Sequence, residues 1–223
     1  MTKRPLDVIG ALSSLPMFQT LNAQELARLS VGTRVLRAGR GQVLFSKGEP
    51  AENCHIVLFG KVKLALSAGT TQEKVLEIVG PGESFGEALL FLGKPYPVTA
   101  ECLVESLVLQ VPGANLFAAV DANPRFARQV LAGLSARLHR LINDVEAFST
   151  RNAAQRLVGY LLNLCGGGSS AELPTSKHVI ASLLNLTPET LSRILHALTV
   201  DGLIEVDGRR IVIRDAGRLR EYA

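Results

Sequence analysis

A long heptad pattern in the second half of the chain is the feature that most limits how it can fold. Apolar residues recur there with alternating spacings of four and three, at Ala127, Leu131, Leu134, Leu138, Leu141, Val145 and Phe148. This a/d periodicity is typical of helices that pair along a coiled-coil seam. A second apolar set, Phe126, Val130 and Ile142, flanks the seam. The pattern predicts a helix that packs on its own domain with one side and on a twin helix with the other. The alternative is a core helix of a monomer.

The segment before this helix has the pattern of a β domain. Short β-branched or alternating runs are separated by glycines, and the runs are Thr33–Leu36, Gln42–Phe45, His55–Leu58, Lys61–Leu66, Lys74–Val79, Thr99–Cys102 and Ser106–Val111. Many short strands with turn residues between them favour an antiparallel barrel or sandwich. Ahead of the strands, Asn22 and Glu25 have the spacing of a capping box and predict a short helix.

The net charge of the chain is +4, and the basic excess lies in its C-terminal half. Residues 1–122 hold 11 Lys/Arg and 11 Asp/Glu, residues 123–150 hold 4 and 2, and residues 151–223 hold 9 and 7. This asymmetry is compatible with a nucleic-acid partner without proving one. No run approaches the roughly eighteen apolar residues of a membrane span, and Leu6–Phe18 is too interrupted for a signal peptide. We therefore expect a cytoplasmic protein with no membrane partner.

The cysteines and the other reactive residues give no catalytic or metal-binding pattern. Cys54, Cys102 and Cys165 are 48 and 63 residues apart, with no CxxC or Cys/His cluster. Neither a zinc site nor a local iron–sulfur cassette is indicated, and buried, reduced thiols are expected. Because no Ser/His/Asp set, P-loop or paired-carboxylate motif is present either, we do not expect an enzyme and predict no catalytic residues.

Helical patterns continue beyond the heptad segment. Ser149-Thr150 is a candidate N-cap for a helix from about Arg151 to Leu164, which the glycine-rich loop Cys165–Ser170 follows. Thr175-Ser176 can cap a helix that ends near Leu184. The next three residues, 185–187, are expected to form the turn into a further helix.

That further helix begins with Thr187 as its cap and Pro188 at its first position, where a missing N–H costs nothing. Its predicted buried face consists of Leu191, Ile194, Leu195 and Leu198. Its other face, near the N-terminal end, carries Glu189, Thr190, Ser192, Arg193 and His196.

These polar residues suit base edges in the major groove of DNA. Arg193 can donate two hydrogen bonds to guanine, Glu189 can accept one from cytosine, and Ser192 can do either. Thr190 is placed to contact a thymine methyl group or a phosphate. The alternative is a solvated face with an incidental Glu189–Arg193 ion pair.

A β-hairpin is predicted directly after this helix. Leu203–Val206 and Arg209–Ile213 flank Asp207-Gly208, a dipeptide typical of a type I′ turn. Arg209 and Arg210 at its tip can contact phosphates. Helix, turn, helix and hairpin in this order are typical of a winged helix-turn-helix. In such a domain phosphate contacts supply affinity and base contacts supply specificity.

Three blocks of the sequence resemble the Crp/Fnr superfamily of bacterial transcription regulators: Gly82–Phe91, the heptad helix and Thr187–Arg193. The resemblance covers essentially the whole chain. The E-T-x-S-R pattern at Glu189–Arg193 is similar to the Fnr branch, whose dimers read two inverted half-sites of the TTGAT type. It implies Glu189, Ser192 and Arg193 as base readers of double-stranded DNA. It also implies an activator that works as a homodimer with RNA polymerase.

The fold expected from the sequence and from this resemblance belongs to the α+β class. Residues 1–122 are expected to form an antiparallel β-barrel sensor domain of the jelly-roll, cyclic-nucleotide-binding-like type. Residues 123–149 form the dimerisation helix, and residues 150–223 form the winged helix-turn-helix. An effector is expected to alter the packing of the long helix on the barrel, and a hinge near Phe148–Thr150 then reorients the DNA-binding domains.

The sensor block departs from the cyclic-AMP-binding members of the family. The chain keeps Gly86 and Glu87, but it has Tyr96 and Pro97 where those members have Arg-Ser. Tyr96 supplies no guanidinium, and Pro97 offers a phosphate neither a hydroxyl nor an N–H. The helix positions that bind adenine in those members are Leu141 and Ile142 here. We therefore predict no useful affinity for cyclic AMP, and without the N-terminal cysteine cluster no Fnr-type iron–sulfur centre is expected.

An apolar effector pocket between barrel and helix remains, and its expected lining is Gly86, Glu87, Tyr96, Pro97, Leu138, Leu141 and Ile142. The segments Gly93–Val98 and Arg137–Arg140 resemble the denitrification regulators, which are thought to sense nitric oxide through haem. His139 is a candidate haem ligand and His55 a second one. For each, a histidine without a ligand is the alternative. The rival function is a ligand-binding regulatory subunit that acts on a protein partner without binding DNA.

Overall fold

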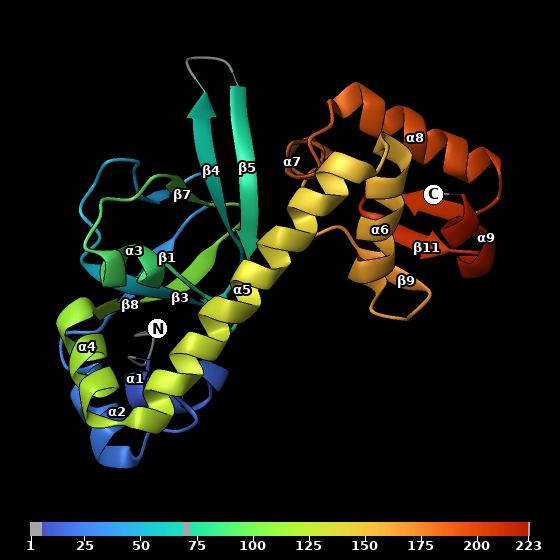
Figure 1. The fold of residues 1–223 in the computed structure, drawn as a ribbon. Helices are drawn as coiled ribbons and strands as arrows, with labels where there is room; N and C mark the ends of the chain where they lie inside the picture. The colour runs from blue at the N-terminus through green and yellow to red at the C-terminus, as the bar shows by residue number, and fades with distance from the viewer. Residues whose placement is uncertain (1–5, 69–71, 223) are drawn as a thin grey trace, which may run out of the picture. The chain divides into compact units, whose positions relative to one another are not determined.

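The computed structural model describes residues 6–68 and 72–222, and for residues 67, 68, 72, 144 and 146–148 it describes the backbone alone (Figure 1). The chain divides into two compact units, and the main division falls inside the long helix α5, Pro124–Thr150, between Leu138 and His139. The short segment Glu73–Val75 is grouped with the second unit. The α+β class predicted from the sequence is confirmed. The exact domain limits, 1–122, 123–149 and 150–223, stay a prediction.

The first unit is built on two antiparallel sheets of four strands, with the orders β1-β8-β3-β6 and β2-β7-β4-β5. The strands are β1 Arg34–Ala38, β2 Val43–Phe45, β3 Asn53–Phe59, β4 Val62–Ala68, β5 Gln72–Val79, β6 Ser84–Phe85, β7 Thr99–Cys102 and β8 Ser106–Pro112. Every strand expected from the sequence is present. The two-residue strand β6 is additional, and it pairs with β3 through Phe85 and His55.

Both sheets contribute to one apolar core, which includes Phe45, Val57, Phe85, Tyr96 and Val108. Along β3 and β8 they alternate with residues such as Ile56 and Leu109, which are buried in a second core on the other face of the same sheet. Burial of this apolar surface is the main force that holds the two sheets together.

A second core lies between the sheet of β3 and β8 and the helices of this unit. The helices are α1 Val8–Ser13, η1 Pro16–Phe18, α2 Ala23–Ser30, α3 Glu87–Leu92 and α4 Gly113–Ala122, and Figure 1 shows α1, α2 and α4 beside the first turns of α5. The predicted capping box of α2 is confirmed: the Glu25 amide donates to Asn22 Oδ1 at 3.0 Å and the Asn22 amide to Glu25 Oε2 at 2.7 Å.

The helix α5 begins in this second core and then becomes largely exposed. Phe126 is fully buried and stacks on Phe18, with ring centroids 5.8 Å apart. Val130 is buried, and Leu134 packs partly against the same core. In contrast, Leu131, Leu138 and Val145 are 61%, 59% and 63% exposed. Three successive a positions of the heptad pattern therefore have no partner within the described chain.

The other residues of the heptad pattern and its flanking set differ in their solvent exposure. Ala127 is half-buried, whereas Leu141 of the seam and Ile142 of the flanking set are exposed. The side chain of Phe148 lies outside the described residues. The expectation that Phe126 and Val130 pack on the helix's own domain is met.

The second unit continues with α6 Ala153–Cys165, α7 Lys177–Leu183, α8 Pro188–Val200 and α9 Ala216–Glu221. Its sheet has the order β10-β11-β9, with β10 Ile204–Asp207, β11 Arg210–Ile213 and β9 Ser170–Glu172. The strand β9 was not expected, because it lies within a glycine- and serine-rich segment. Within residues 6–68 and 72–222, none of the helices has the length and apolar character needed to cross a membrane.

The start of α6 differs from the prediction. Ser149 and Thr150 do not cap it, because α5 runs on through Thr150. The N-cap is Asn152, whose Oδ1 accepts from the Gln155 amide at 2.9 Å while Gln155 Oε1 accepts from the Asn152 amide at 2.8 Å. This reciprocal capping box satisfies two backbone donors at once, which a lone Ser or Thr cap does not.

Candidate DNA-binding interface

The helix-turn-helix consists of α7, a short turn and α8, as the sequence predicts. Thr187 caps α8 by accepting from the Thr190 amide at 3.2 Å, and Pro188 occupies the first helical position. The turn includes Asn185, whose φ of 56° lies in the left-handed region. Asn tolerates this conformation better than most residues, so it suits a sharp reversal between two helices.

The helix α8 has one buried and one exposed side. Leu191, Leu195 and Leu198 are buried, and Ile194 is half-buried. On the opposite side, the exposed residues are Glu189, Ser192, Arg193 and His196. The buried leucines anchor the helix in the core of this unit, and its polar side faces the solvent.

Two of the predicted contact residues are tied to the cap of α8. The Thr187 hydroxyl lies 3.1 Å from the hydroxyl of the half-buried Thr190. The pKa of Glu189 is lowered by hydrogen bonds from its own backbone N–H and from the Thr187 hydroxyl, and the charge of His178 acts in the same direction. A carboxylate at a helix N-terminus is stabilised in its ionised, acceptor-only form. Glu189 is thus prepared to accept a hydrogen bond from a base amino group.

The predicted wing is the hairpin of β10 and β11, but its turn is shifted by one residue. Asp207 pairs with Arg210, so Gly208 and Arg209 are the central turn residues. Gly208 has a φ of 58°, and no non-glycine residue of the hairpin has a positive φ. A type I′ turn needs positive φ at both central positions, so the predicted I′ turn at Asp207-Gly208 is wrong. The pattern fits a turn with glycine first, as in type II′.

The arginines of the wing are exposed and differ in their partners. Arg209 forms an ion pair of 2.8 Å with Glu172 of β9, and Arg214 pairs with Glu205 across the hairpin. Arg210 is exposed at the end of the turn. Exposed pairs of this kind contribute little to stability, so they yield readily to a phosphate.

Arg156 of α6 is a residue of this unit that the sequence reasoning missed. Its guanidinium donates to the carbonyls of Leu184 and Asn185 in the helix-turn-helix turn and to that of Arg151. No local spacing signals such a contact, because Arg156 and Leu184 are 28 residues apart.

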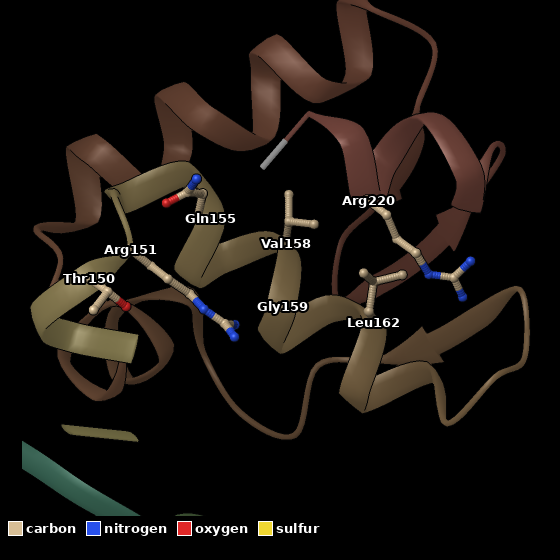
Figure 2. A pocket seen from close by; sticks show the side chains of 7 residues that line it. All are labelled: Thr150, Arg151, Gln155, Val158, Gly159, Leu162 and Arg220. Atoms are coloured by element: carbon tan, nitrogen blue, oxygen red, sulfur yellow. The ribbon is translucent and has the colours of Figure 1, made fainter. Parts of the chain in front are cut away.

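A groove of about 360 Å³ runs along α6. Figure 2 shows its lining residues, which are Thr150, Arg151, Gln155, Val158, Gly159, Leu162 and Arg220. The Arg151 guanidinium lies so close to Gly159 that a Cβ there would be 3.1 Å from its Nη1. None of the residues predicted to contact DNA lines this groove.

Two of the predicted effector residues of the first unit, Gly86 and Tyr96, lie against each other. Tyr96 is 3% exposed and stacks on Phe45, with ring centroids 3.6 Å apart and planes at 10°. Its hydroxyl donates to the Asn53 carbonyl at 3.1 Å. Gly86 has a φ of 88°, and a Cβ there would lie 3.2 Å from the Tyr96 ring. Tyr96 therefore fills the space beside Gly86, while Pro97 is exposed.

Glu87 is paired within the protein. It is 4% exposed, and its Oε1 lies 3.3 Å from Nη1 of Arg137, which also pairs with Glu77 of β5. Its Oε2 has no hydrogen-bond partner among the described residues. The two carboxylates on one guanidinium join β5, α3 and the first half of α5. This triad was not predicted, because three separate segments bring it together.

The two candidate haem ligands have different environments. His55 is 2% exposed between aromatic rings, and its ring centroid is 5.1 Å from that of Phe85. Burial lowers the pKa of His55 to about 4, so it is neutral. It is a core residue, whereas His139 is exposed on α5. Among residues 6–68 and 72–222, no group of three or more His, Cys, Asp or Glu side chains is arranged to hold a metal.

The three cysteines are free thiols, as expected. Cys54 and Cys102 are buried, but Cys165 is only half-buried at the end of α6. Burial raises the pKa of the Cys54 thiol, and the neighbouring Glu87 raises it further. This thiol is therefore protonated and unreactive.

Comparison with known proteins agrees with this architecture. Residues 35–123 match the cyclic nucleotide-binding domain family, and residues 155–222 match the Crp-like helix-turn-helix domain. Together these matches cover the two sheets of the first unit and nearly all of the second unit beyond α5. The fold and the exposed face of α8 define a regulator with a sensor-type domain and a DNA-binding domain.

The chain is similar to known proteins over most of their length, and a transcription regulator is among them. The chain is 26% identical over 219 residues to a CRP-like cAMP-activated global transcriptional regulator of Mycobacterium tuberculosis, covering 95% of this chain and 98% of the relative. It is 32% identical to the crystal structure of DNR from Pseudomonas aeruginosa, covering all of both chains with a TM-score of 0.53. FixK2 from Bradyrhizobium japonicum is 25% identical, with a TM-score of 0.77 over 85% of this chain and 96% of that one. The chain belongs to the Crp/Fnr family of DNA-binding transcription regulators.

Proposed function

We propose that this regulator acts as a homodimer that recognises a TTGAT-like inverted repeat in double-stranded DNA. The observation that carries the proposal is the polar side of α8, where Glu189, Ser192 and Arg193 are exposed together above a buried row of leucines. Side chains of these types near the N-terminal end of a recognition helix suit base edges in the major groove.

Each side chain has a defined task in this proposal. Arg193 donates a bidentate pair to guanine, the ionised Glu189 accepts from cytosine, and Ser192 serves either role. The residues proposed to contact phosphates or flanking groups are Thr187, Thr190, His196, Arg209 and Arg210. Such contacts fix the position of the protein on the duplex and add affinity without reading sequence.

The exposed seam of α5 supports the homodimer. Leu131, Leu138 and Val145 repeat at intervals of seven and are each more than half exposed. A row of apolar residues with heptad spacing is buried when two such helices pair. We assign Ala127, Leu134, Leu141 and Phe148 to the same proposed interface.

Cyclic AMP does not suit this sensor domain as an effector. Tyr96 is buried against Phe45 and fills the space beside Gly86, and Glu87 is engaged by Arg137. A buried cyclic phosphate would need a cation that Tyr96 and Pro97 do not provide. We expect calorimetry with cyclic AMP to give no binding in the low micromolar range, although relatives such as the Mycobacterium tuberculosis regulator are cAMP-activated.

Haem with nitric oxide is the effector we propose, from the resemblance to the denitrification regulators. His139 is the candidate ligand because its imidazole is exposed, whereas His55 is enclosed by aromatic rings. Titration of the apo-protein with haemin should shift the Soret band, and His139→Ala should abolish the shift. An unshifted band in the wild-type protein would remove haem from the proposal.

The effector is proposed to act through a hinge at the C-terminal end of α5, directly before the junction with α6. Two recognition helices must lie about 34 Å apart to enter successive major grooves. A small rotation at Phe148–Thr150 makes or breaks that spacing, so the effector shifts a population between two dimer geometries. The protein is proposed to act in the cytoplasm as an activator, with RNA polymerase as its partner.

A gel-shift experiment with the purified chain tests the whole proposal. A palindrome of TTGAT half-sites is titrated with the apo-protein, after addition of haem, and after addition of nitric oxide. We expect retardation of the palindrome that responds to the effector and exceeds that of a scrambled duplex. Operator affinity identical in all three conditions would refute the effector and hinge parts.

The rival function is a ligand-binding regulatory subunit that acts on a protein partner without DNA. It would not need the Glu189, Ser192 and Arg193 side of α8. Arg193→Ala would then leave regulation intact in cells, whereas the DNA-binding proposal expects regulation to be lost.

A further inference from the structure

Arg156 connects three parts of the second unit through backbone carbonyls. Its Nε donates to the Leu184 carbonyl at 3.0 Å, its Nη2 to the Asn185 carbonyl at 3.4 Å, and its Nη1 to the Arg151 carbonyl at 2.8 Å. Leu184 is the C-cap of α7, and Arg151 lies in the junction between α5 and α6. One side chain of α6 thus holds both the turn of the helix-turn-helix and the junction that leads to it.

The chemistry at this turn requires a cation with several donors. Carbonyls at a helix C-terminus lack helical partners and carry a partial negative charge, so a nearby guanidinium stabilises them. The turn also contains the left-handed Asn185, a conformation that surrounding contacts must maintain. Arginine presents five donors in a rigid planar fork, and lysine offers only a compact charge on a flexible stem.

The orientation of α8 depends on this turn. The Leu186 amide donates to the Ala181 carbonyl at 2.8 Å, and Thr187 already caps α8. The side chains proposed to read bases lie in the first two turns of α8. A specific contact tolerates displacements of only about 0.5 Å, so a loosened turn misplaces Arg193 before it affects phosphate contacts.

We propose that Arg156 is a positioning residue for DNA recognition, which sets the recognition helix and couples it to the α5–α6 junction without touching DNA. The inference rests on the proposed DNA binding, but its structural part can be measured on the free protein. Two variants separate charge from geometry: Arg156→Lys keeps the positive charge, and Arg156→Gln removes it. Arg218→Lys and Arg218→Gln, at an exposed arginine of α9, are the matched controls.

The first arm measures hydrogen exchange of the full-length free protein. In Arg156→Lys we expect faster exchange of the Asn185 and Leu186 amides, by about tenfold, because the loss of hydrogen bonds to a charged group is of that size. The amides of β3 and β8 in the first unit should be unchanged. Exchange at the turn equal to that of the wild-type protein would overturn the proposal.

The second arm measures affinity for the TTGAT palindrome and for a scrambled duplex by fluorescence anisotropy over a range of salt concentrations. Arg156→Lys should lose about tenfold in affinity for the palindrome, with unchanged affinity for the scrambled duplex. The salt slope, which is the slope of the logarithm of the binding constant against the logarithm of the salt concentration, should also be unchanged. A slope lowered by about one in Arg156→Gln, with weaker binding to both duplexes, would make Arg156 a phosphate contact and overturn the proposal.

The two arms also distinguish failure of this inference from failure of the proposed function. If the wild-type protein binds both duplexes equally, sequence-specific recognition is wrong, and the exchange data still decide whether Arg156 holds the turn. If Arg156→Gln does not fold, the Lys variant carries both measurements, and thermal unfolding of each variant verifies that it is folded.

Discussion

At the scale of single residues, the core of the first unit contains a neutral histidine among aromatic rings. His55 lies against Phe45 and Phe85, and its Nε2 is 3.4 Å from Gln110 Nε2. Its Nδ1 has no hydrogen-bond partner among the described residues. Protonation would place a charge in this buried site, which is why burial depresses its pKa.

This histidine makes the stability of the protein sensitive to acid. The pKa of His55 is about 4 in the folded protein, against an ordinary value of 6.5. Below pH 6.5 the unfolded chain takes up a proton that the folded chain does not, so stability falls between pH 6.5 and about 4. The loss approaches about 3 kcal/mol at the acid end.

Urea unfolding of wild-type protein and His55→Phe between pH 7.5 and 4.5 measures this effect. In His55→Phe, the free energy of unfolding should depend less on pH in this window. His139→Gln, at an exposed histidine, should show the same pH dependence as the wild-type protein. If wild type and His55→Phe lose stability in parallel, His55 is not the responsible group.

The sequence predicts some single residues of the site well and others not at all. The row of apolar residues at i, i+3, i+4 and i+7 predicted which side of α8 is exposed, and so identified Glu189, Ser192 and Arg193. Asn152 and Gln155 have the same capping-box spacing as Asn22 and Glu25, so the sequence contains the signal for the true cap of α6 as well as the competing Ser149-Thr150. The contacts of Arg156 and Arg137 could not be predicted from the sequence, because they join segments that are far apart in the chain.

At the scale of elements, the wing is the part of the site that differs most from expectation. Its strands were predicted, but the turn is centred on Gly208 and Arg209, which places Arg209 within the turn and Arg210 at the start of β11. The turn preference of the Asp207-Gly208 dipeptide did not predict the register of the hairpin. Asp207 instead pairs with Arg210 and is the last residue of β10.

Arg210→Ala tests the role of the wing. We expect weaker binding to specific and scrambled duplexes alike, with a salt slope reduced by about one, because a phosphate contact carries no sequence information. Anisotropy titrations at several salt concentrations measure both quantities, with Arg218→Ala as the control for the loss of one charge. A change in base preference without a change in slope would argue against a phosphate contact.

The helix α5 permits a similar test of dimerisation. Val145→Glu places a carboxylate on the exposed a row of the seam, where burial in a dimer without a partner costs at least about 2 kcal/mol. Light scattering should show a dimer for the wild-type protein and a shift toward monomer for the variant.

Ala136→Glu provides the control for this experiment, because position 136 is an exposed f position on the opposite side of the same helix. It should remain dimeric. A monomeric wild-type protein at micromolar concentration would contradict the homodimer, and a dimeric Val145→Glu would place the interface elsewhere.

At the scale of the whole molecule, the order of the parts was predictable because each has its own periodicity. Alternating strands, a heptad helix and a helix-turn-helix with a hairpin follow one another in the sequence, and both family matches agree with that order. The short strands β6 and β9 were missed, since two or three residues carry no periodic signal. The filling of the sensor core by Tyr96 was not predicted either, because a substituted motif does not reveal where the new side chain packs.

DNA recognition by Arg193 is tested most directly by the affinity of the full-length protein, in its binding-competent state, for three duplexes: the TTGAT palindrome, the same duplex changed only at the guanine of each half-site, and a scrambled duplex. We predict that the wild-type protein prefers the TTGAT palindrome over the scrambled duplex by about a thousandfold or more at physiological salt. We also predict that Arg193→Ala loses about 1–3 kcal/mol of binding free energy together with the guanine preference. Equal affinity of the wild-type protein for all three duplexes, or an Arg193→Ala variant that still discriminates guanine, would contradict this recognition.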